Sequence, residues 1–84
     1  MKHQSHPGIL KRLRRTEGHL RAVIAMLEEH RPCLDLAQQL HAVEKAVSSA
    51  KRELIHDHLE HCLEGKGADT KTALREMKQL AKYL

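Results

Sequence analysis

Residues 33–64 read CLDLAQQLHAVEKAVSSAKRELIHDHLEHCLE, without a proline or a glycine. Apolar residues recur along this stretch at alternating steps of four and three, at Leu36, Leu40, Val43, Val47, Ala50 and Leu54. This spacing is typical of a helix with one apolar stripe, as in coiled coils. The segment therefore predicts a single long helix of roughly 45 Å, at about 1.5 Å per residue.

A shorter helix is predicted before this segment, from about residue 9 to about residue 29, opened by Pro7 and Gly8. Its apolar residues fit one helix face and are Ile9, Leu13, Leu20, Val23, Ile24 and Leu27. Gly18 interrupts it at a cost of about 1 kcal/mol relative to alanine. This glycine is either simply tolerated or indicates the close approach of a neighbouring helix.

A third helix is predicted from about residue 70 to residue 84, after a break at Gly65 and Gly67 and with Asp69 as its N-cap. One face of it carries Ala73, Met77, Leu80 and Leu84. No segment alternates with the period of a strand. The predicted fold class is all-α, a three-helix protomer with a long central helix.

The chain is small, with 84 residues, and we expect one domain over residues 1–84 in which residues 1–8 form a mobile N-terminal arm. Apolar residues make up 40% of it, but there is one Tyr and no Phe or Trp. Such a chain usually needs oligomerisation when no disulfide framework supports it. Because the first helix is too short to cover the long stripe, the central helix is predicted to pack against another chain.

Charge and hydropathy restrict the compartment and the partners. Charged residues make up 31% of the chain, and no apolar run approaches the roughly 20 residues of a membrane span. The N-terminus MKHQSHPG lacks the apolar region of a signal peptide, so we expect a cytoplasmic protein with reduced thiols. The net charge of +4 favours polyanionic partners.

The segment His56–Cys62, HDHLEHC, carries the candidate chemistry. His58 and Cys62 are four residues apart, so they share one helix face and can bind one metal ion. His58 also lies four residues beyond Leu54, which continues the apolar stripe towards the partner chain. His56 and His61 fall on other faces and are expected to be solvated.

The other cysteine, Cys33, lies at the opposite end of the same helix. Twenty-five residues separate it from His58, or about 37 Å along a continuous helix, so the two cannot meet within one chain. The same argument excludes a disulfide between Cys33 and Cys62 of one chain. In an antiparallel pair of central helices, Cys33 of one protomer meets His58 and Cys62 of the other, which gives two equivalent sites per dimer.

Two thiolates and one imidazole form a soft ligand set that suits Cu(I). A fourth ligand would allow Zn(II), and additional nitrogen donors would allow Ni(II) or Co(II). His3 and His6, on the N-terminal arm, are candidate extra donors.

The chain resembles the CsoR/RcnR family of bacterial metal-sensing repressors from about residue 9 to residue 84. The motifs that carry the resemblance are Arg12-Leu13, Gly18-His19-Leu20, Met26-Leu27-Glu28, Cys33, Gln39-Leu40, Ala42-Val43, and Asp57-His58-Leu59 with Cys62. The resemblance implies a helical dimer that assembles into a homotetramer, a dimer of dimers, and binds operator DNA without a helix-turn-helix. In the copper-sensing branch it implies a Cu(I) site across the dimer interface, and Cys33, His58 and Cys62 occupy its three positions.

Other branches of the family remain alternatives. The nickel and cobalt branch typically has His at the last position and recruits an N-terminal His, so Cys62 favours copper while His3 keeps Ni(II) and Co(II) open. The formaldehyde branch uses a Cys at the Cys33 position with the N-terminal amine. The persulfide branch has the two Cys but lacks the intervening His, so the presence of His58 argues against this branch.

The resemblance also implies that a Tyr and a Glu lie beside the metal ligands in copper sensors. Glu76 is the candidate carboxylate. The residue before Cys33 is Pro32, and the single tyrosine of the chain is Tyr83, so this chain departs from the pattern there.

The predicted function is a repressor that binds operator DNA without metal and leaves it on binding Cu(I). The basic residues expected to contact double-stranded DNA are Arg12, Arg14, Arg15, Lys51 and Arg52. The lack of aromatic residues argues against single-strand binding by base stacking. A metal buffer that ignores DNA is the alternative from another class. An enzyme is not expected, because no orienting residue completes a Cys–His pair and no glycine-rich loop is present.

Overall fold

A computed structural model describes residues 6–63 and 70–84, with Cys62 and Leu63 described by their backbone alone. These residues form three helices: α1 (His6–Glu28), α2 (Cys33–Leu63) and α3 (Thr70–Ala81). The predicted all-α class and the long central helix are confirmed. No helix among the described residues is long and apolar enough to cross a membrane.

Helix α1 begins earlier than the sequence pattern indicates. It starts at His6, so residues 6–8 of the predicted N-terminal arm belong to its first turn. Pro7 fits there because its ring presets a helical φ and the first turn needs no N–H from it. His3 lies outside the described residues, as do the predicted break at Gly65 and Gly67 and the predicted N-cap Asp69.

The turn between α1 and α2 is a Schellman motif. The N–H of Arg31 donates to the carbonyl of Met26 at 3.1 Å, and the N–H of His30 donates to that of Leu27 at 3.1 Å. His30 has a φ of 59°, the left-handed conformation that glycine usually supplies at this position. Pro32 then prevents α1 from continuing and starts α2, because its carbonyl accepts the first helical bond, from the N–H of Leu36 at 3.1 Å.

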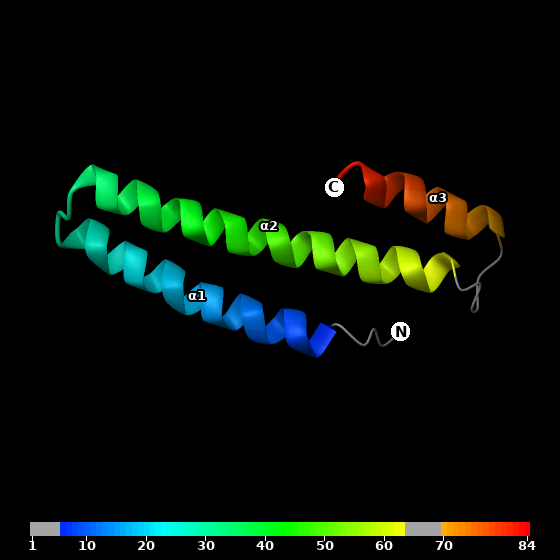
Figure 1. The fold of residues 1–84 in the computed structure, drawn as a ribbon, viewed down its shortest axis with the longest axis horizontal. Helices are drawn as coiled ribbons and strands as arrows, with labels where there is room; N and C mark the ends of the chain where they lie inside the picture. Colours follow the sequence, from blue (N-terminus) through cyan, green and yellow to red (C-terminus); the bar gives the residue numbers. More distant parts are fainter. Residues whose placement is uncertain (1–5, 64–69) are drawn as a thin grey trace.

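The three helices lie side by side in a thin, elongated molecule (Figure 1). Helices α1 and α2 form an antiparallel hairpin, and α3 runs back along the C-terminal half of α2. The molecule measures 54 × 23 × 13 Å, with a radius of gyration of 17.1 Å. A compact chain of this length would have a radius of gyration of about 12 Å. The hairpin therefore buries a smaller core than a compact globular chain of the same length.

The buried core is correspondingly small. Among the described residues it consists of Ile9 and Val23 of α1 with Val43, Ala50 and Ile55 of α2. The predicted stripe of α2 divides into two rows. Its members Val43 and Ala50 are buried against α1, whereas Leu40, Val47 and Leu54 are 49%, 47% and 41% exposed. The first helix leaves part of the stripe uncovered, as predicted, but the reason is the face of α2 on which it packs rather than its length.

Helix α1 carries a second exposed row, at Leu13, Leu20 and Leu27. Leu13 and Leu27 each come four residues after a buried residue of α1, as Val47 and Leu54 do in α2. A step of four residues turns about 40° around a helix. Because α1 and α2 are antiparallel, this turn brings both rows to the same side of the hairpin. We call these six residues of α1 and α2 the open apolar face.

The exposed surface of the chain is 6852 Å². A compact monomer of 9.6 kDa would expose about 5100 Å². The open apolar face accounts for part of the difference, and a continuous apolar surface of this kind is typical of a site for another protein surface.

Of the two interpretations of Gly18, simple tolerance agrees with the structure of the single chain, because a Cβ atom there would meet nothing within 4 Å. The predicted extent of the third helix to residue 84 is wrong. Helix α3 ends at Ala81, and Leu84 is 57% exposed beyond it, whereas Met77 and Leu80 are half-buried as predicted. The last residues instead form a tighter turn, in which the N–H of Tyr83 donates to the carbonyl of Leu80 at 3.0 Å.

Candidate metal centre

Cys33 is the first residue of α2 and carries an exposed, free thiol. The turn that precedes it places it there, because the carbonyl of Pro32 accepts the first hydrogen bond of α2. Cys33 also lies seven residues before Leu40, and therefore in the same row as Leu40, Val47 and Leu54. The thiol thus marks one end of the exposed row of α2.

His58 marks the other end of this row. It follows Leu54 by four residues, one helical turn further along α2. Its side chain is 25% exposed, and its Nε2 atom lies 3.5 Å from Oε2 of Glu76 in α3. Nε2 is itself shielded from solvent. The structure thus brings the predicted partners His58 and Glu76 together, through the packing of α3 on α2.

A cavity of about 550 Å³ lies between α2 and α3 at this point. His58 and Glu76 line it together with Leu54, Ile55, Gln79, Leu80, Lys82 and Tyr83. Tyr83 therefore reaches the surroundings of His58 from the end of α3, although it lies far in sequence from the position before Cys33. It is 64% exposed in the single chain.

The predicted ligands do not converge within one chain. Helix α2 is continuous from Cys33 to Leu63, so the separation of about 37 Å between Cys33 and His58 stands. Among residues 6–63 and 70–84, no group of three His, Cys, Asp or Glu side chains could hold a metal ion. Cys62 belongs to α2 one turn after His58, but its side chain lies outside what the structure describes.

Three further histidines of α1 and α2 differ in their exposure and contacts. His56 is exposed, as predicted. The prediction that His61 is solvated is wrong, because its side chain is half-buried and its Nε2 is shielded from solvent. His19, which sequence reasoning left without a role, joins the two helices of the hairpin. Its Nε2 donates to Oε1 of Gln39 at 2.6 Å, in a partly buried position.

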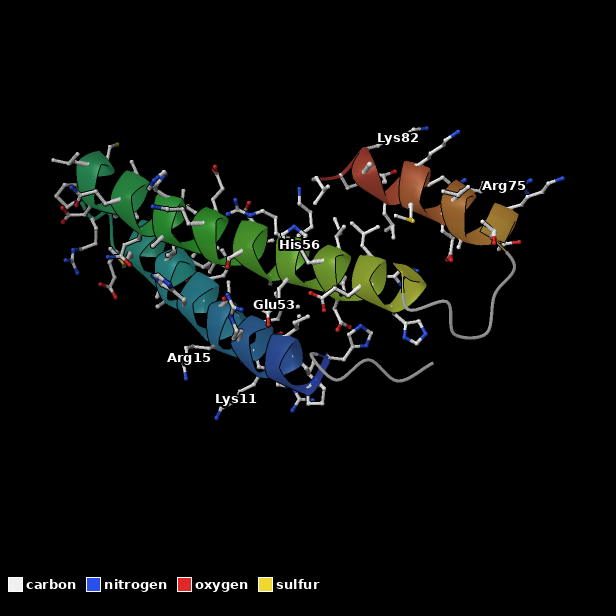
Figure 2. All side chains as sticks on the ribbon, turned by 45° about the vertical axis from the view of Figure 1, so that its right-hand side comes forward. Lys11, Arg15, Glu53, His56, Arg75 and Lys82 are labelled. Atoms are coloured by element: carbon white, nitrogen blue, oxygen red, sulfur yellow. The ribbon has the colours of Figure 1, made fainter. Side chains whose placement is uncertain are left out.

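The basic residues of α1 divide into two groups. Figure 2 shows Lys11 and Arg15 pointing away from α2, into solvent. Arg12 instead turns towards α2, where its Nη1 donates to the carboxylate of Glu53 and its Nη2 to Oγ of Ser49 at 2.8 Å. The other predicted DNA-contacting residues, Arg14, Lys51 and Arg52, are exposed.

Comparison with known proteins places the chain in a family. The family model described as metal-sensitive transcriptional repressor matches residues 5–84, nearly the whole sequence. The chain belongs to this family. Its members are transcriptional regulators rather than enzymes, and the resemblance found in the sequence is confirmed.

Individual relatives agree with this membership. The copper-sensing transcriptional repressor RicR of Mycobacterium tuberculosis is 40% identical over 76 residues, which cover 83% of this chain and 79% of RicR. The copper-sensing transcriptional repressor CsoR of Bacillus subtilis is 35% identical over 71 residues, covering 82% and 70% of the two chains. Among solved structures, the nickel-responsive transcriptional regulator InrS has a TM-score of 0.84 at 30% identity, covering 100% of this chain and 98% of that one.

Among the described residues of this metal-sensitive repressor, the candidate ligands Cys33 and His58 lie too far apart to share a metal ion within one chain. Cys33 presents a free, exposed thiol, and His58 presents an imidazole whose Nε2 faces Glu76. A carboxylate beside the second nitrogen of a metal-binding histidine is a common arrangement, because it fixes the tautomer and orients the ring. Sulfur and imidazole donors suit soft or borderline metals.

Proposed function

We propose that this chain is a repressor that binds operator DNA in its metal-free form and leaves it when Cu(I) binds. The ligands are Cys33 of one protomer with His58 and Cys62 of its partner. The protein acts in the cytoplasm as a dimer that pairs further into a tetramer. When bound, Cu(I) supplies a link between the two protomers through thiolate and imidazole donors.

The observation that carries this proposal is the position of Cys33 and His58 at opposite ends of the open apolar face. A second copy that covers this face in the antiparallel sense places each Cys33 beside the other protomer's His58. Burying Leu40, Val47 and Leu54 in the same interface supplies the free energy of association, at about 25 cal/mol for each Å² of apolar surface. One partner chain would therefore both cover the open apolar face and bring Cys33 and His58 together.

Glu76 gives the site a route to the rest of the protomer. If the proton of the His58 ring sits on Nε2, it faces Glu76, and Nδ1 keeps the lone pair that a metal ligand requires. A metal ion bound at Nδ1 would shift the imidazole ring, and this shift would change the position of Nε2 relative to Glu76 of α3. Since α3 packs on α2, a change at His58 is transmitted to the outer surface of the helices.

Through this route, metal binding and DNA binding are expected to weaken each other. The affinity for each ligand falls when the other is bound, by the same factor and typically by 1–3 kcal/mol. The exposed basic residues of α1 and α2 supply the phosphate contacts, so DNA binding should weaken steeply with salt.

Ni(II) is the second candidate signal. The observation in its favour is the structural similarity to the nickel-responsive regulator InrS over the whole chain. His3, in the segment before α1, is then the additional nitrogen donor.

Metal titration separates the two candidates. Reduced protein is titrated anaerobically with Cu(I) against a chelator of known affinity, and with Ni(II) in parallel, using wild type, Cys33→Ser and His3→Ala. We expect tight binding of one Cu(I) per chain, lost in Cys33→Ser and kept in His3→Ala. Weak Cu(I) binding with tight Ni(II) binding that requires His3 would transfer the proposal to nickel.

DNA binding separates a repressor from a metal buffer. A labelled duplex selected from a random pool by the metal-free protein is titrated by fluorescence anisotropy, with and without Cu(I), at several salt concentrations. Binding that falls steeply with salt and is lost on adding Cu(I) supports the repressor. Tight Cu(I) binding without any effect on DNA would identify a metal buffer, and failure of both metals to bind would point to a sensor of thiol-reactive small molecules such as formaldehyde.

A further inference from the structure

Arg12, Ser49 and Glu53 form a polar cluster on the side of the hairpin opposite the open apolar face. Arg12 comes three residues after the buried Ile9, and Glu53 three residues after the buried Ala50. A step of three residues turns about 60° in the opposite sense to a step of four. The cluster therefore stays exposed when a second copy covers the apolar face. Figure 2 shows Glu53 between α1 and α2, whereas Arg15 and Lys11 point outwards.

Both terminal nitrogens of the Arg12 guanidinium are already engaged. Nη1 donates to the Glu53 carboxylate and Nη2 to Oγ of Ser49 at 2.8 Å. A guanidinium grips a phosphate most strongly through two parallel N–H groups. While Nη1 and Nη2 each donate one of their two N–H groups within the hairpin, fewer N–H groups of Arg12 are available to a DNA phosphate, and its charge is already paired with that of Glu53.

The ion pair is open enough to be exchanged. The side chains of Arg12 and Glu53 are 44% and 43% exposed, and an ion pair at this degree of exposure contributes little to the stability of a fold. Beside it on α2 lies a hollow of about 500 Å³, lined by Glu44, Lys45, Ala46, Ser48, Ser49 and Arg52. The two basic residues of this lining, Lys45 and Arg52, outnumber its one acidic residue, Glu44, which favours an anion, and Ser49 belongs both to the hollow and to the Arg12 cluster.

We propose that Glu53 is a positioning residue that sets DNA affinity by competing with a backbone phosphate for Arg12. In the free protein Glu53 holds the guanidinium on α2. In the DNA complex the phosphate takes the place of Glu53, next to the hollow that Lys45 and Arg52 line. Glu53 thereby lowers the affinity for all DNA sequences alike, because a phosphate contact carries no sequence information. This inference rests on the proposed DNA binding and adds a residue that opposes it.

The test is a double-mutant cycle of Glu53→Gln and Arg12→Gln, with DNA affinity measured across a range of salt concentrations on the selected duplex. Glutamine has nearly the shape of glutamate, so the hairpin is retained, and circular dichroism at each salt concentration verifies this. We expect Glu53→Gln to raise the affinity roughly threefold for each protomer that contacts DNA. The slope of log K against log salt should steepen by about 0.9 per protomer, the signature of one additional phosphate contact.

The Arg12→Gln background is the matched control. There Glu53→Gln should leave the salt slope unchanged, because the guanidinium on which Glu53 acts is missing. An equal gain in both backgrounds would overturn the proposal in favour of a general charge effect. An unchanged or weaker affinity in the single variant would also overturn it, since Glu53 would then merely brace the hairpin or orient Arg12 favourably. If wild type does not bind the duplex at all, the proposed function itself fails, and that result is distinct from both.

Discussion

Nε2 of His58 lies 3.5 Å from Oε2 of Glu76, and this contact ties the candidate metal ligand in α2 to α3. The distance is longer than that of a short hydrogen bond, so the contact has room to tighten. When the second nitrogen of a metal-binding histidine faces a carboxylate on another helix, a change in the orientation of the ring can be passed to that helix. We therefore expect the pair to act in signalling as well as in metal binding.

The first prediction concerns Glu76→Gln. The variant keeps all three proposed ligands, so one Cu(I) per chain should still bind. The effect of Cu(I) on DNA affinity, expected at 1–3 kcal/mol in wild type, should fall towards zero because glutamine attracts the His58 ring less strongly. Anisotropy titrations with and without Cu(I) measure this effect. Arg75→Gln, on the same helix but pointing away from α2 in Figure 2, should behave as wild type. Complete release of DNA by Cu(I) in Glu76→Gln would exclude this route.

The second prediction tests the site between chains by mixing two inactive variants. Cys33→Ser and His58→Ala should each bind Cu(I) poorly when pure. After the two are unfolded and refolded together, about half of the dimers are mixed, and each mixed dimer contains one complete site and one site that lacks both residues. Tight Cu(I) binding should then return, with a quarter of the wild-type stoichiometry. A site built from one chain could never be restored by mixing, so continued absence of binding would refute the shared site.

The third prediction concerns the open apolar face. Val47 lies at the centre of the exposed row of α2 and is 47% exposed, so Val47→Glu should leave the hairpin folded. In the dimer the same change buries an unpaired carboxylate and removes apolar contact. We expect the dissociation constant to rise at least tenfold, since burying a valine contributes about 1.5 kcal/mol. Sedimentation velocity at several concentrations measures this. Gln38→Glu adds the same charge to an exposed position of α2 and should not alter assembly; an equal effect of both variants would argue against this interface.

The sequence predicts the helices well because their bounds depend on local signals. Pro32 and the periodic apolar residues place the start of α2 at Cys33, where the structure has it. The stripe of α2 was predicted as one surface, whereas it divides into a row against α1 and a row left open. Periodicity alone cannot make this division, because it depends on how α1 is rotated against α2. Val43 and Val47 are the same residue type in the same stripe, yet Val43 is buried and Val47 is exposed.

Polar contacts between the helices escape sequence reasoning for a related reason. Arg12 was predicted as a DNA contact from its charge, and nothing local indicates that it reaches Glu53, 41 residues away. His19 and Gln39 likewise meet only because the hairpin sets their positions. The candidate metal ligands are a different case. The structure confirms that Cys33 and His58 lie on one continuous helix and far apart, whereas their meeting across two chains stays a prediction.

The last prediction concerns His30, which lies in the turn after α1 with a φ of 59°. The Schellman bonds around it would be kept by glycine, which adopts this conformation without the steric cost borne by a side chain. His30→Gly should therefore stabilise the protein by about 1 kcal/mol, which corresponds to a rise in Tm of roughly 4–8 °C for a chain of this size. Thermal unfolding is compared at one protein concentration, because association also raises Tm. Glu29→Gly, one residue earlier and without a positive φ, should instead lower Tm, since there glycine adds only flexibility. A lower Tm in His30→Gly would mean that the imidazole contributes more at the turn than its backbone strain costs.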